Sequence, residues 1–332
     1  MSSPISGVGA ADQRRVPAHV SLLKTSLAGL PLPDLAGLLL TVLAWSSLHP
    51  IAKRTLVEIT PIQLPFSRVA LASVFLLVVC LFSGRLGQVV ALFRPRHLWK
   101  VVVLGTTGFS LSSGLSMIAL SYLPAGINSV LANSSPLMVA LGIMLLLRER
   151  LSRRMLAGLV VGFAGVSVIA LRGGLDASGL SLVGVLLSLV SAATWAVYTV
   201  LARRLSAGQD VIAMSAATSL VGALPLGAVV AIEGDVGRLL GASSTTYLLL
   251  VWCGVVATGA TFTMWVLLLR RINAARVSSF QYLIPLFALG LAYPIAGEVP
   301  TTAALLGAAM IVGGVAFANA GNGATRTTHR ER

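Results

Sequence analysis

Two stretches of the chain read alike: L-P-A-G-I-N-S from Leu123 to Ser129, and I-N-A-A-R-V-S from Ile272 to Ser278. The same landmarks follow both stretches at one constant offset: a proline, a glutamate and two glycines. In the first copy they are Pro136, Glu149, Gly158 and Gly165, and in the second Pro285, Glu298, Gly307 and Gly314. Upstream, A-W-S-S from Ala44 pairs with T-W-A-V from Thr194. The chain therefore contains a weak internal repeat.

Both copies consist mainly of long apolar runs. The chain has 332 residues, of which 56% are hydrophobic and 10% charged, whereas a soluble domain carries about 25% charged residues. A helix of roughly 20 apolar residues crosses a bilayer, and the runs lack the alternating polarity of membrane barrel strands. We predict an all-α integral membrane protein of about ten transmembrane helices, at 35–52, 63–83, 99–120, 125–147, 155–171, 180–201, 211–232, 246–268, 273–295 and 302–319.

The repeat divides these spans into two groups of five. We place the first repeat at 35–172 and the second at 173–320, with an N-terminal tail over 1–34 and a C-terminal tail over 321–332. An odd number of spans inverts the second copy relative to the first, and inverted repeats are typical of secondary transporters. The predicted fold is thus two inverted five-helix repeats.

The basic residues predict how the chain is oriented in the membrane. The formal net charge is +14, but most of the 24 Lys and Arg residues fall in alternate loops. Cytoplasmic loops carry this excess, which predicts a bacterial inner-membrane protein with both termini in the cytoplasm. The charge is accounted for by topology, so we expect the lipid bilayer and a small-molecule substrate as partners, and no nucleic acid.

The spans offer little chemistry for catalysis. All ten Asp and Glu residues lie outside the span centres, and the four histidines are scattered: His19, His49, His97 and His329. A membrane hydrolase needs a nucleophile with a base, or clustered metal ligands. We therefore predict no enzyme, no metal site and no cofactor. A non-transporting membrane subunit or a sensor is the alternative to a transporter, although no loop is long enough to fold as a signalling domain.

The motifs of the two repeats resemble the EamA family of the drug/metabolite transporter superfamily over about residues 36–319. The resemblance rests on Pro136 and Pro285, the turns Arg148-Glu149-Arg150 and Gly297-Glu298, the glycine-rich last helices, W-S-S-L-H-P-I-A-K from Trp45, and Arg68. Arg148 and His49 depart from the residues usual at their positions. The resemblance implies a secondary transporter of small metabolites that works by alternating access, with export of amino acids or related compounds as the family-based expectation.

The stretch W-S-S-L-H-P-I-A-K-R from Trp45 to Arg54 holds the first candidate site residues. Trp45, His49 and Lys53 recur at one helical turn and share a face, and Pro50 interrupts the helix because it cannot donate to the carbonyl of Ser46. We predict a polar, cavity-facing patch in which His49 binds substrate or titrates. A histidine that only bonds a neighbouring helix is the equal alternative.

The paired prolines mark the second group of candidates. Interruptions in corresponding helices of inverted repeats point to a central site. Polar or aromatic side chains that precede the breaks, or match Trp45 in the second repeat, are predicted to bind substrate: Asn128, Asn133, Ser134, Trp195, Tyr198, Gln281 and Tyr282. Pro50, Pro136 and Pro285 are the predicted helix breaks or gating positions. Helix–helix hydrogen bonding and interfacial aromatic packing are the alternatives.

Two basic residues remain as possible charge contacts with substrate. Lys53, like Arg54, can instead extend to the outer lipid headgroups. Arg68 lies inside a span and can instead act as a structural clamp, paired with Glu58 or with backbone carbonyls. The structural clamp is an equal alternative to the substrate contact.

Overall fold

The structure is a computed structural model that describes residues 30–123, 125–171, 181–296 and 301–320, without the side chains of His49, Lys53, 125–126, Leu289 and 291–296. Within these residues every regular element is a helix. The elements are α2 (Leu32–Ser46), α3 (Leu48–Thr55), α4 (Gln63–Phe82), α5 (Leu86–Leu92), α6 (Pro95–Gly105), η1 (Thr106–Leu111), α7 (Ser112–Ala119), α8 (Ala125–Ala132), α9 (Ser135–Leu146), α10 (Arg153–Ala170), α11 (Leu182–Leu205), α12 (Val211–Glu233), α13 (Val236–Leu240), α14 (Ser244–Gly254), η3 (Val255–Ala260), α15 (Thr261–Arg271), α16 (Ala274–Ser279), η4 (Phe280–Tyr282), α17 (Leu283–Ala296) and α18 (Thr302–Asn319).

The predicted fold class is confirmed. In the described part of the chain, nine helices are long and apolar enough to cross a membrane. The remaining predicted span, 273–295, is present but divided into α16, η4 and α17, of which α17 has 14 residues. The predicted tails lie largely outside the described residues; the first helix already begins at Leu32, with a proline in its first turn.

Short polar side chains set where several helices begin. Ser152, Ser181, Asp210, Ser243 and Thr301 each accept a hydrogen bond from a backbone N–H in the first turn of the helix that follows. These caps satisfy a donor that has no partner within the helix. The apolar interiors need no such support, because each backbone group bonds within its own helix.

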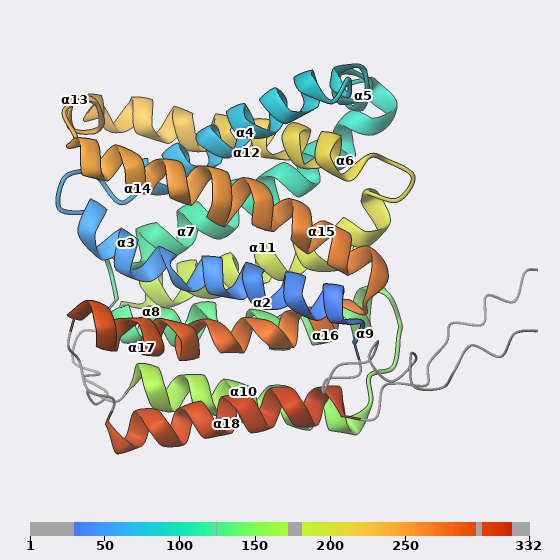
Figure 1. Cartoon of the computed structure of the whole chain (residues 1–332), viewed down its shortest axis with the longest axis vertical. Helices are drawn as coiled ribbons and strands as arrows, with labels where there is room; N and C mark the ends of the chain where they lie inside the picture. Colours follow the sequence, from blue (N-terminus) through green and yellow to red (C-terminus); the bar gives the residue numbers. More distant parts are fainter. Residues whose placement is uncertain (1–29, 124, 172–180, 297–300, 321–332) are drawn as a thin grey trace, which may run out of the picture.

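The helices run side by side between two ends of the molecule (Figure 1). One end holds the 56–62 connection together with α13, and we call it the Glu58 face. The other holds α5 and the 206–210 connection, and we call it the Asp210 face. By the charge rule the Glu58 face is the predicted outer side and the Asp210 face the predicted cytoplasmic side.

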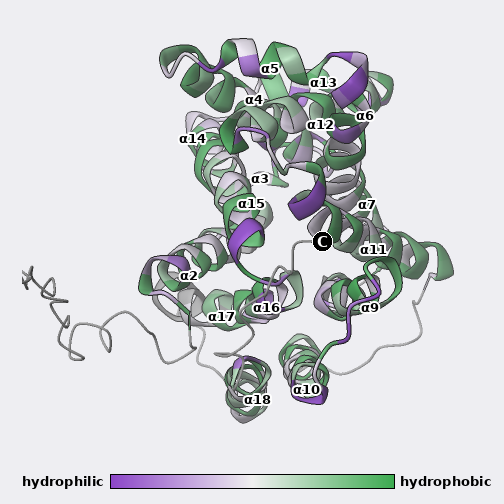
Figure 2. Cartoon of the chain, turned by 90° about the vertical axis from the view of Figure 1, so that its right-hand side faces the viewer, coloured by the Kyte–Doolittle hydropathy of each residue, from purple (hydrophilic) through white to green (hydrophobic). Residues whose placement is uncertain are grey.

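The two repeats interlock through their glycines. A Cβ on Gly158 would lie 2.6 Å from the carbonyl oxygen of Gly314, and one on Gly165 would lie 2.6 Å from that of Gly307. These contacts bring α10 and α18 together, side by side at one edge of the molecule in Figure 2. The glycines thus permit close contact between the repeats, because each repeat contributes one helix to a shared pair.

A second set of crossings is symmetric between the repeats. A Cβ on Gly105 of α6 would lie 2.6 Å from the carbonyl oxygen of Thr218 on α12. Correspondingly, a Cβ on Gly254 at the end of α14 would lie 3.1 Å from the carbonyl oxygen of Arg68 on α4. Each crossing joins one repeat to the other, so the core is built from helices of both.

Two π-helical segments occupy matching places in the repeats. Thr106–Leu111 separates α6 from α7, and Val255–Ala260 separates α14 from α15. A π-turn changes the hydrogen-bond register of a helix and is frequent at functional sites. Neither segment was expected from the apolar runs at 99–120 and 246–268.

Candidate functional site

Six aromatic side chains from four elements form one cluster in the middle of the molecule. Trp45 lies 5.0 Å from Trp265 and 5.5 Å from Trp195, measured between ring centroids. Trp195 in turn lies 5.3 Å from Tyr198, one turn along α11. The members, called here the aromatic cluster, are Trp45 of α2, Phe109 of η1, Trp195 and Tyr198 of α11, and Phe262 and Trp265 of α15. Three predicted site residues are thus brought together.

Trp45 is fixed by its ring nitrogen. Its Nε1–H donates to the carbonyl oxygen of Ala257 at 3.1 Å and to Oγ1 of Thr261 at 3.0 Å. Ala257 belongs to the π-helical segment η3, where the altered register leaves carbonyl groups to external donors. The indole therefore joins α2 of the first repeat to the helix break of the second.

The other two indoles of the aromatic cluster have no such partner. The Nε1 atoms of Trp195 and Trp265 are buried and make no hydrogen bond to any residue that the structure describes, and their rings are 5.9 Å apart. A buried donor without an acceptor costs about 1–3 kcal/mol, so each unsatisfied N–H calls for an explanation. Two such donors beside stacked rings suit a ligand that carries a hydrogen-bond acceptor and an apolar part.

The helix around Pro50 is broken at Ser47. α2 ends at Ser46 and α3 begins at Leu48, as expected where a proline cannot donate to the residue four positions earlier. Ser47 is held there because its Oγ accepts from Trp252 Nε1 at 3.0 Å. The side chains of His49 and Lys53 lie outside the described residues.

The polar residues before Pro136 are used within the protein. Asn128 accepts from Ser188 of α11 and donates Nδ2–H to the carbonyl oxygen of Ser116 at 3.3 Å. Asn133 and Ser134 bond back to carbonyl oxygens of the preceding helix α8, where α8 stops before α9. These contacts correspond to the helix–helix alternative, and binding of substrate by these three residues stays a prediction.

The two proline-marked breaks meet across the repeats. Ser135, at the start of α9, donates to Oε1 of Gln281 at 3.4 Å, and Gln281 lies in the 3-10 turn before Pro285. Tyr282 is fully buried against Gly162 of α10, and its hydroxyl makes no hydrogen bond. Tyr282 is therefore, after Trp195, the second unsatisfied donor among the predicted residues, and it lies on the α10 side of the break.

Arg68 does not pair with Glu58, and that expectation was wrong. Arg68 donates from Nη2 to Oγ of Ser113 at 2.5 Å. Glu58 instead accepts from the backbone N–H and the hydroxyl of Ser243 at 2.7 and 2.9 Å. These two hydrogen bonds lower the pKa of Glu58, with a smaller contribution from the positive charge of Arg54. The reason for the changed pairing is that the 56–62 connection reaches the second repeat, where it caps α14.

Two hollows among the described residues open at the Glu58 face. One, of about 670 Å³, is lined by Glu58, Asp235, Gly237, Arg238, Gly241, Ala242 and Ser243. The other, of about 330 Å³, lies beside Pro61, Tyr122 and Glu233. The predicted cavity wall around Trp45 is instead a set of rings in mutual contact, with Trp45 only 7% exposed.

The pattern of two interlocked repeats can now be compared with known proteins. The profile of the EamA-like transporter family matches residues 34–171 and again residues 182–320. The chain belongs to the EamA-like transporter family.

Relatives of this EamA-like transporter agree with that assignment. It is 31% identical over 285 residues to a "Probable terminal-alkyne amino-acid exporter" of Streptantibioticus cattleyicolor, covering 85% of this chain and 92% of the relative. It is 28% identical over 284 residues to the "Uncharacterized transporter YvbV" of Bacillus subtilis, covering 84% and 88%. One crystal structure superposes with a TM-score of 0.71 at 23% identity, covering 86% of this chain and 96% of that chain, and supports the fold. The protein is a multi-pass membrane transporter.

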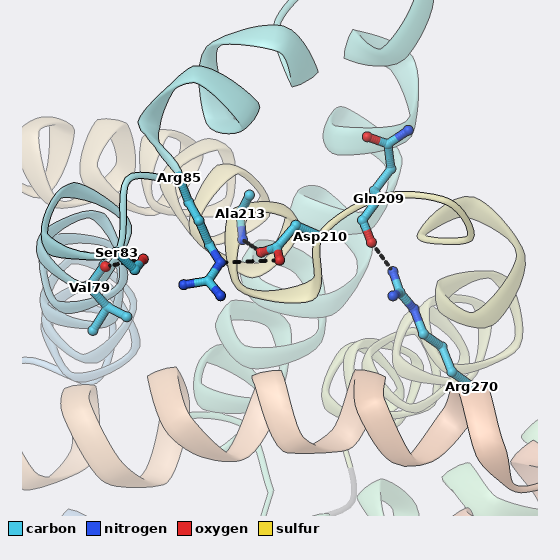
Figure 3. Close-up of polar contacts among 7 residues, drawn as sticks. All are labelled: Val79, Ser83, Arg85, Gln209, Asp210, Ala213 and Arg270. Atoms are coloured by element: carbon cyan, nitrogen blue, oxygen red, sulfur yellow. Dashed lines mark hydrogen bonds and ion pairs between the residues drawn. The ribbon is translucent and has the colours of Figure 1, made fainter.

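Polar contacts join the ends of several helices at the Asp210 face of this EamA-like transporter (Figure 3), and we call them the Asp210 network. Asp210 caps α12 through the N–H of Ala213 at 2.9 Å and pairs with Nε of Arg85 at 3.3 Å. Arg270, at the end of α15, donates to the carbonyl oxygens of Ser206 and Gln209, the latter at 2.8 Å. The network ties the ends of α4, α11 and α15 together.

Sequence reasoning missed half of the aromatic cluster in this EamA-like transporter. Phe262 and Trp265 lie one turn apart on α15, with the same spacing as Trp195 and Tyr198 on α11. Because aromatic residues make up only 6% of the chain, this second pair was a signal that could have been used. Phe109 carried no such signal, since it has no aromatic residue one turn away.

Proposed function

We propose that this EamA-like transporter exports amino acids or related compounds by alternating access, with the aromatic cluster as the substrate site. Two relatives carry names that support the substrate class: the amino-acid exporter described above, and a "Probable amino-acid metabolite efflux pump" of Salmonella typhimurium, 29% identical over 201 residues, 58% of this chain. Inverted repeats with broken helices at a central site support the mechanism.

The single observation that carries the proposal is the pair of unsatisfied indole donors at Trp195 and Trp265. An acceptor oxygen on the substrate would satisfy them and remove their desolvation cost. The ring faces of the aromatic cluster suit an apolar side chain and attract an ammonium group. A small amino acid offers all three groups on one compact skeleton.

The two faces of the molecule support alternating access. The Asp210 face is held by Asp210, Arg85 and Arg270, whereas both hollows lie at the Glu58 face. In the predicted orientation this is a conformation closed toward the cytoplasm. Transport then requires the Asp210 network to break while the contacts at the Glu58 face tighten.

The test is export in a sensitive bacterial host. Expression of the wild type is expected to raise resistance to toxic amino-acid analogues, and Trp195→Phe to reduce that resistance severalfold, because one hydrogen bond of about 0.5–1.5 kcal/mol is lost while the ring is kept. Trp99→Phe is the matched control, since Trp99 is 52% exposed on α6. Resistance equal to that of an empty vector across the panel, with the protein present in the membrane, would contradict the proposal.

A further inference from the structure

Arg68 is a cation inside a span, and no described acidic residue pairs with it. Its one hydrogen bond goes to Ser113 of α7. Its Nε is buried without an acceptor, and so is the neighbouring hydroxyl of Ser67. The nearest carboxylate expected from the sequence, that of Glu58, is engaged with Ser243. The guanidinium therefore has unused hydrogen-bond donors and an uncompensated positive charge.

The depth of this charge makes its isolation costly. Arg68 lies five residues after the start of α4, and Ser113 six residues before the end of α7. At 1.5 Å per residue both are about 8–9 Å from the ends of their helices at the Glu58 face. Charged side chains at such depth face the helix bundle or a water-filled path and pair with another charge or with backbone carbonyls. The described spans supply no anionic partner for Arg68, which leaves a mobile anion as its partner.

The contact of Arg68 with α7 places its guanidinium about one turn from the aromatic cluster, on the side of the Glu58 face. Ser113, which accepts from the guanidinium, lies four residues after Phe109 along η1 and α7. The backbone of Arg68 packs on Gly254, one turn before Ala257, the acceptor for Trp45. One turn spans about 5.4 Å, which is within the length of a small amphipathic molecule.

The corresponding crossing of the second repeat has no charged side chain at this place. Thr218 occupies the place of Arg68 in the symmetric crossing, where its carbonyl oxygen faces Gly105. Its hydroxyl is satisfied inside its own helix by the carbonyl oxygen of Met214 at 2.8 Å. The two crossings pack in the same way although only the first carries a cation. Packing alone therefore does not explain why this position is an arginine.

We propose that Arg68 holds the carboxylate of the substrate between the aromatic cluster and the Glu58 face, and so selects acids over amides, esters and amines of the same size. This inference rests on the proposed transport of amino acids and related compounds through the aromatic cluster. A guanidinium presents paired donors that match both oxygens of a carboxylate. The apolar part of the substrate then lies against the rings while its anionic end is held one turn away.

The experiment compares ligands that differ only in their charged ends. Purified protein in a maltoside detergent, free of phospholipid, is titrated with phenylalanine, N-acetylphenylalanine and phenylalaninamide, followed by the fluorescence of the tryptophans in the aromatic cluster. We expect the two acids to bind at least tenfold more tightly than the amide, the scale of a charge-assisted hydrogen bond. Arg68→Gln is expected to abolish this difference, and Arg68→Lys to keep part of it. Arg54→Gln, an exposed arginine at the same face, is expected to leave it unchanged.

The outcomes separate the inference from the proposed function. Equal binding of acid and amide by the wild type overturns the role of Arg68 while amino-acid transport stands, and this arm needs no variant to fold. If no amino-acid compound binds but phenylpropanoate binds in an Arg68-dependent way, the proposed substrate class fails and the carboxylate site stands.

A last arm distinguishes substrate from lipid as the source of the anion. Phosphate oxygens can engage a guanidinium as carboxylates do. Addition of phosphatidylglycerol, or of inorganic phosphate, is expected to leave the affinity for N-acetylphenylalanine within twofold. Complete competition by the phospholipid would assign Arg68 to a lipid headgroup and overturn the inference.

Discussion

Glu58 shows how one loop carboxylate can join the two repeats. It accepts two hydrogen bonds from Ser243, the residue that caps α14. These bonds favour the ionised form and lower the pKa of Glu58 below its ordinary value. A carboxyl whose pKa is lower in the folded state stabilises the protein above the unfolded value, about 4.3, and this contribution is lost as the pH falls through the folded value.

Glu58→Gln is therefore expected to lower the melting temperature at pH 7, and this effect is expected to shrink as the pH falls below about 4. Thermal unfolding in detergent, followed across this pH range, measures the difference between variant and wild type. Glu149→Gln is the control, because Glu149 is an exposed glutamate at the other face. A melting temperature unchanged by Glu58→Gln at pH 7 would show that the contact with Ser243 adds nothing.

Individual residues could be placed from the sequence where the repeat or the composition singled them out. Trp45 and Trp195 were selected as counterparts, and the structure brings their rings together. The partners of Arg68 and Glu58 could not be selected, because a hydrogen bond between distant positions depends on how the helices cross. Composition alone shows that Arg68 is inside a span; it does not show which helix faces it.

Among the elements, α10 and α18 form a pair that depends on glycine. The backbones cross so closely that a Cβ on Gly314 would lie 2.6 Å from the amide nitrogen of Gly162 and 2.7 Å from the carbonyl oxygen of Gly158. Small residues permit such contact between membrane helices. Gly313, the preceding residue on α18, is exposed and has no atom within 4 Å of its Cβ position.

Gly314→Leu is expected to destabilise the protein by about 1–3 kcal/mol or more, because the side chain must push two backbones apart. Gly313→Leu places the same side chain toward lipid and is expected to be neutral. Yield in detergent and melting temperature measure both variants. Equal behaviour of the two variants would show that the tight crossing of α10 and α18 does not matter for stability.

The helix breaks were predictable only in part. Prolines marked the ends of α2 and α8, since the geometry of proline is fixed by its ring. The π-helical segments η1 and η3 carry no proline, and the small and hydroxyl residues that they contain are also common where membrane helices pack together. Composition therefore could not distinguish a continuous α-helix from one with an altered register.

At the scale of the whole molecule, the Asp210 network is the candidate gate. The ion pair of Asp210 with Arg85 is partly exposed, with side chains 28% and 35% accessible, so it contributes at most about 1 kcal/mol, or roughly fivefold in population. Asp210→Asn removes the charge but keeps a good N-cap for α12. The variant is expected to fold, while the conformation that is closed at the Asp210 face loses part of its free-energy advantage.

A cysteine in place of Ala202 reports opening of the Asp210 face, because Ala202 is fully buried on α11, one turn before Ser206. Maleimide labelling of Ala202→Cys is expected to accelerate severalfold when Asp210→Asn is added, with Cys80 and Cys253 replaced by alanine. Arg238→Gln, which breaks an exposed pair at the Glu58 face, serves as the control. A labelling rate that Asp210→Asn does not change would show that the Asp210 network does not act as a gate.

The inverted topology followed from the repeat, but the interlocking of the repeats did not. Landmarks at a constant offset identify two copies of a unit, without showing whether each copy packs by itself. In the structure α4 lies beside α12 and α10 beside α18. The bodies that move during transport are therefore expected to contain helices from both repeats, rather than one repeat each.

The paired π-helical segments are also places where the length of the chain can change while the orientation of the flanking helices stays the same. A π-turn accommodates one residue more than an α-turn over the same rise. One residue can therefore be removed there while the side chains of both flanking helices keep their orientation. Thr106–Leu111 and Val255–Ala260 are thus two places where deletion of one residue is expected to keep the orientation of the flanking helices. In the second segment that loss would withdraw the acceptor of Trp45, so the two copies differ in how freely they can be shortened.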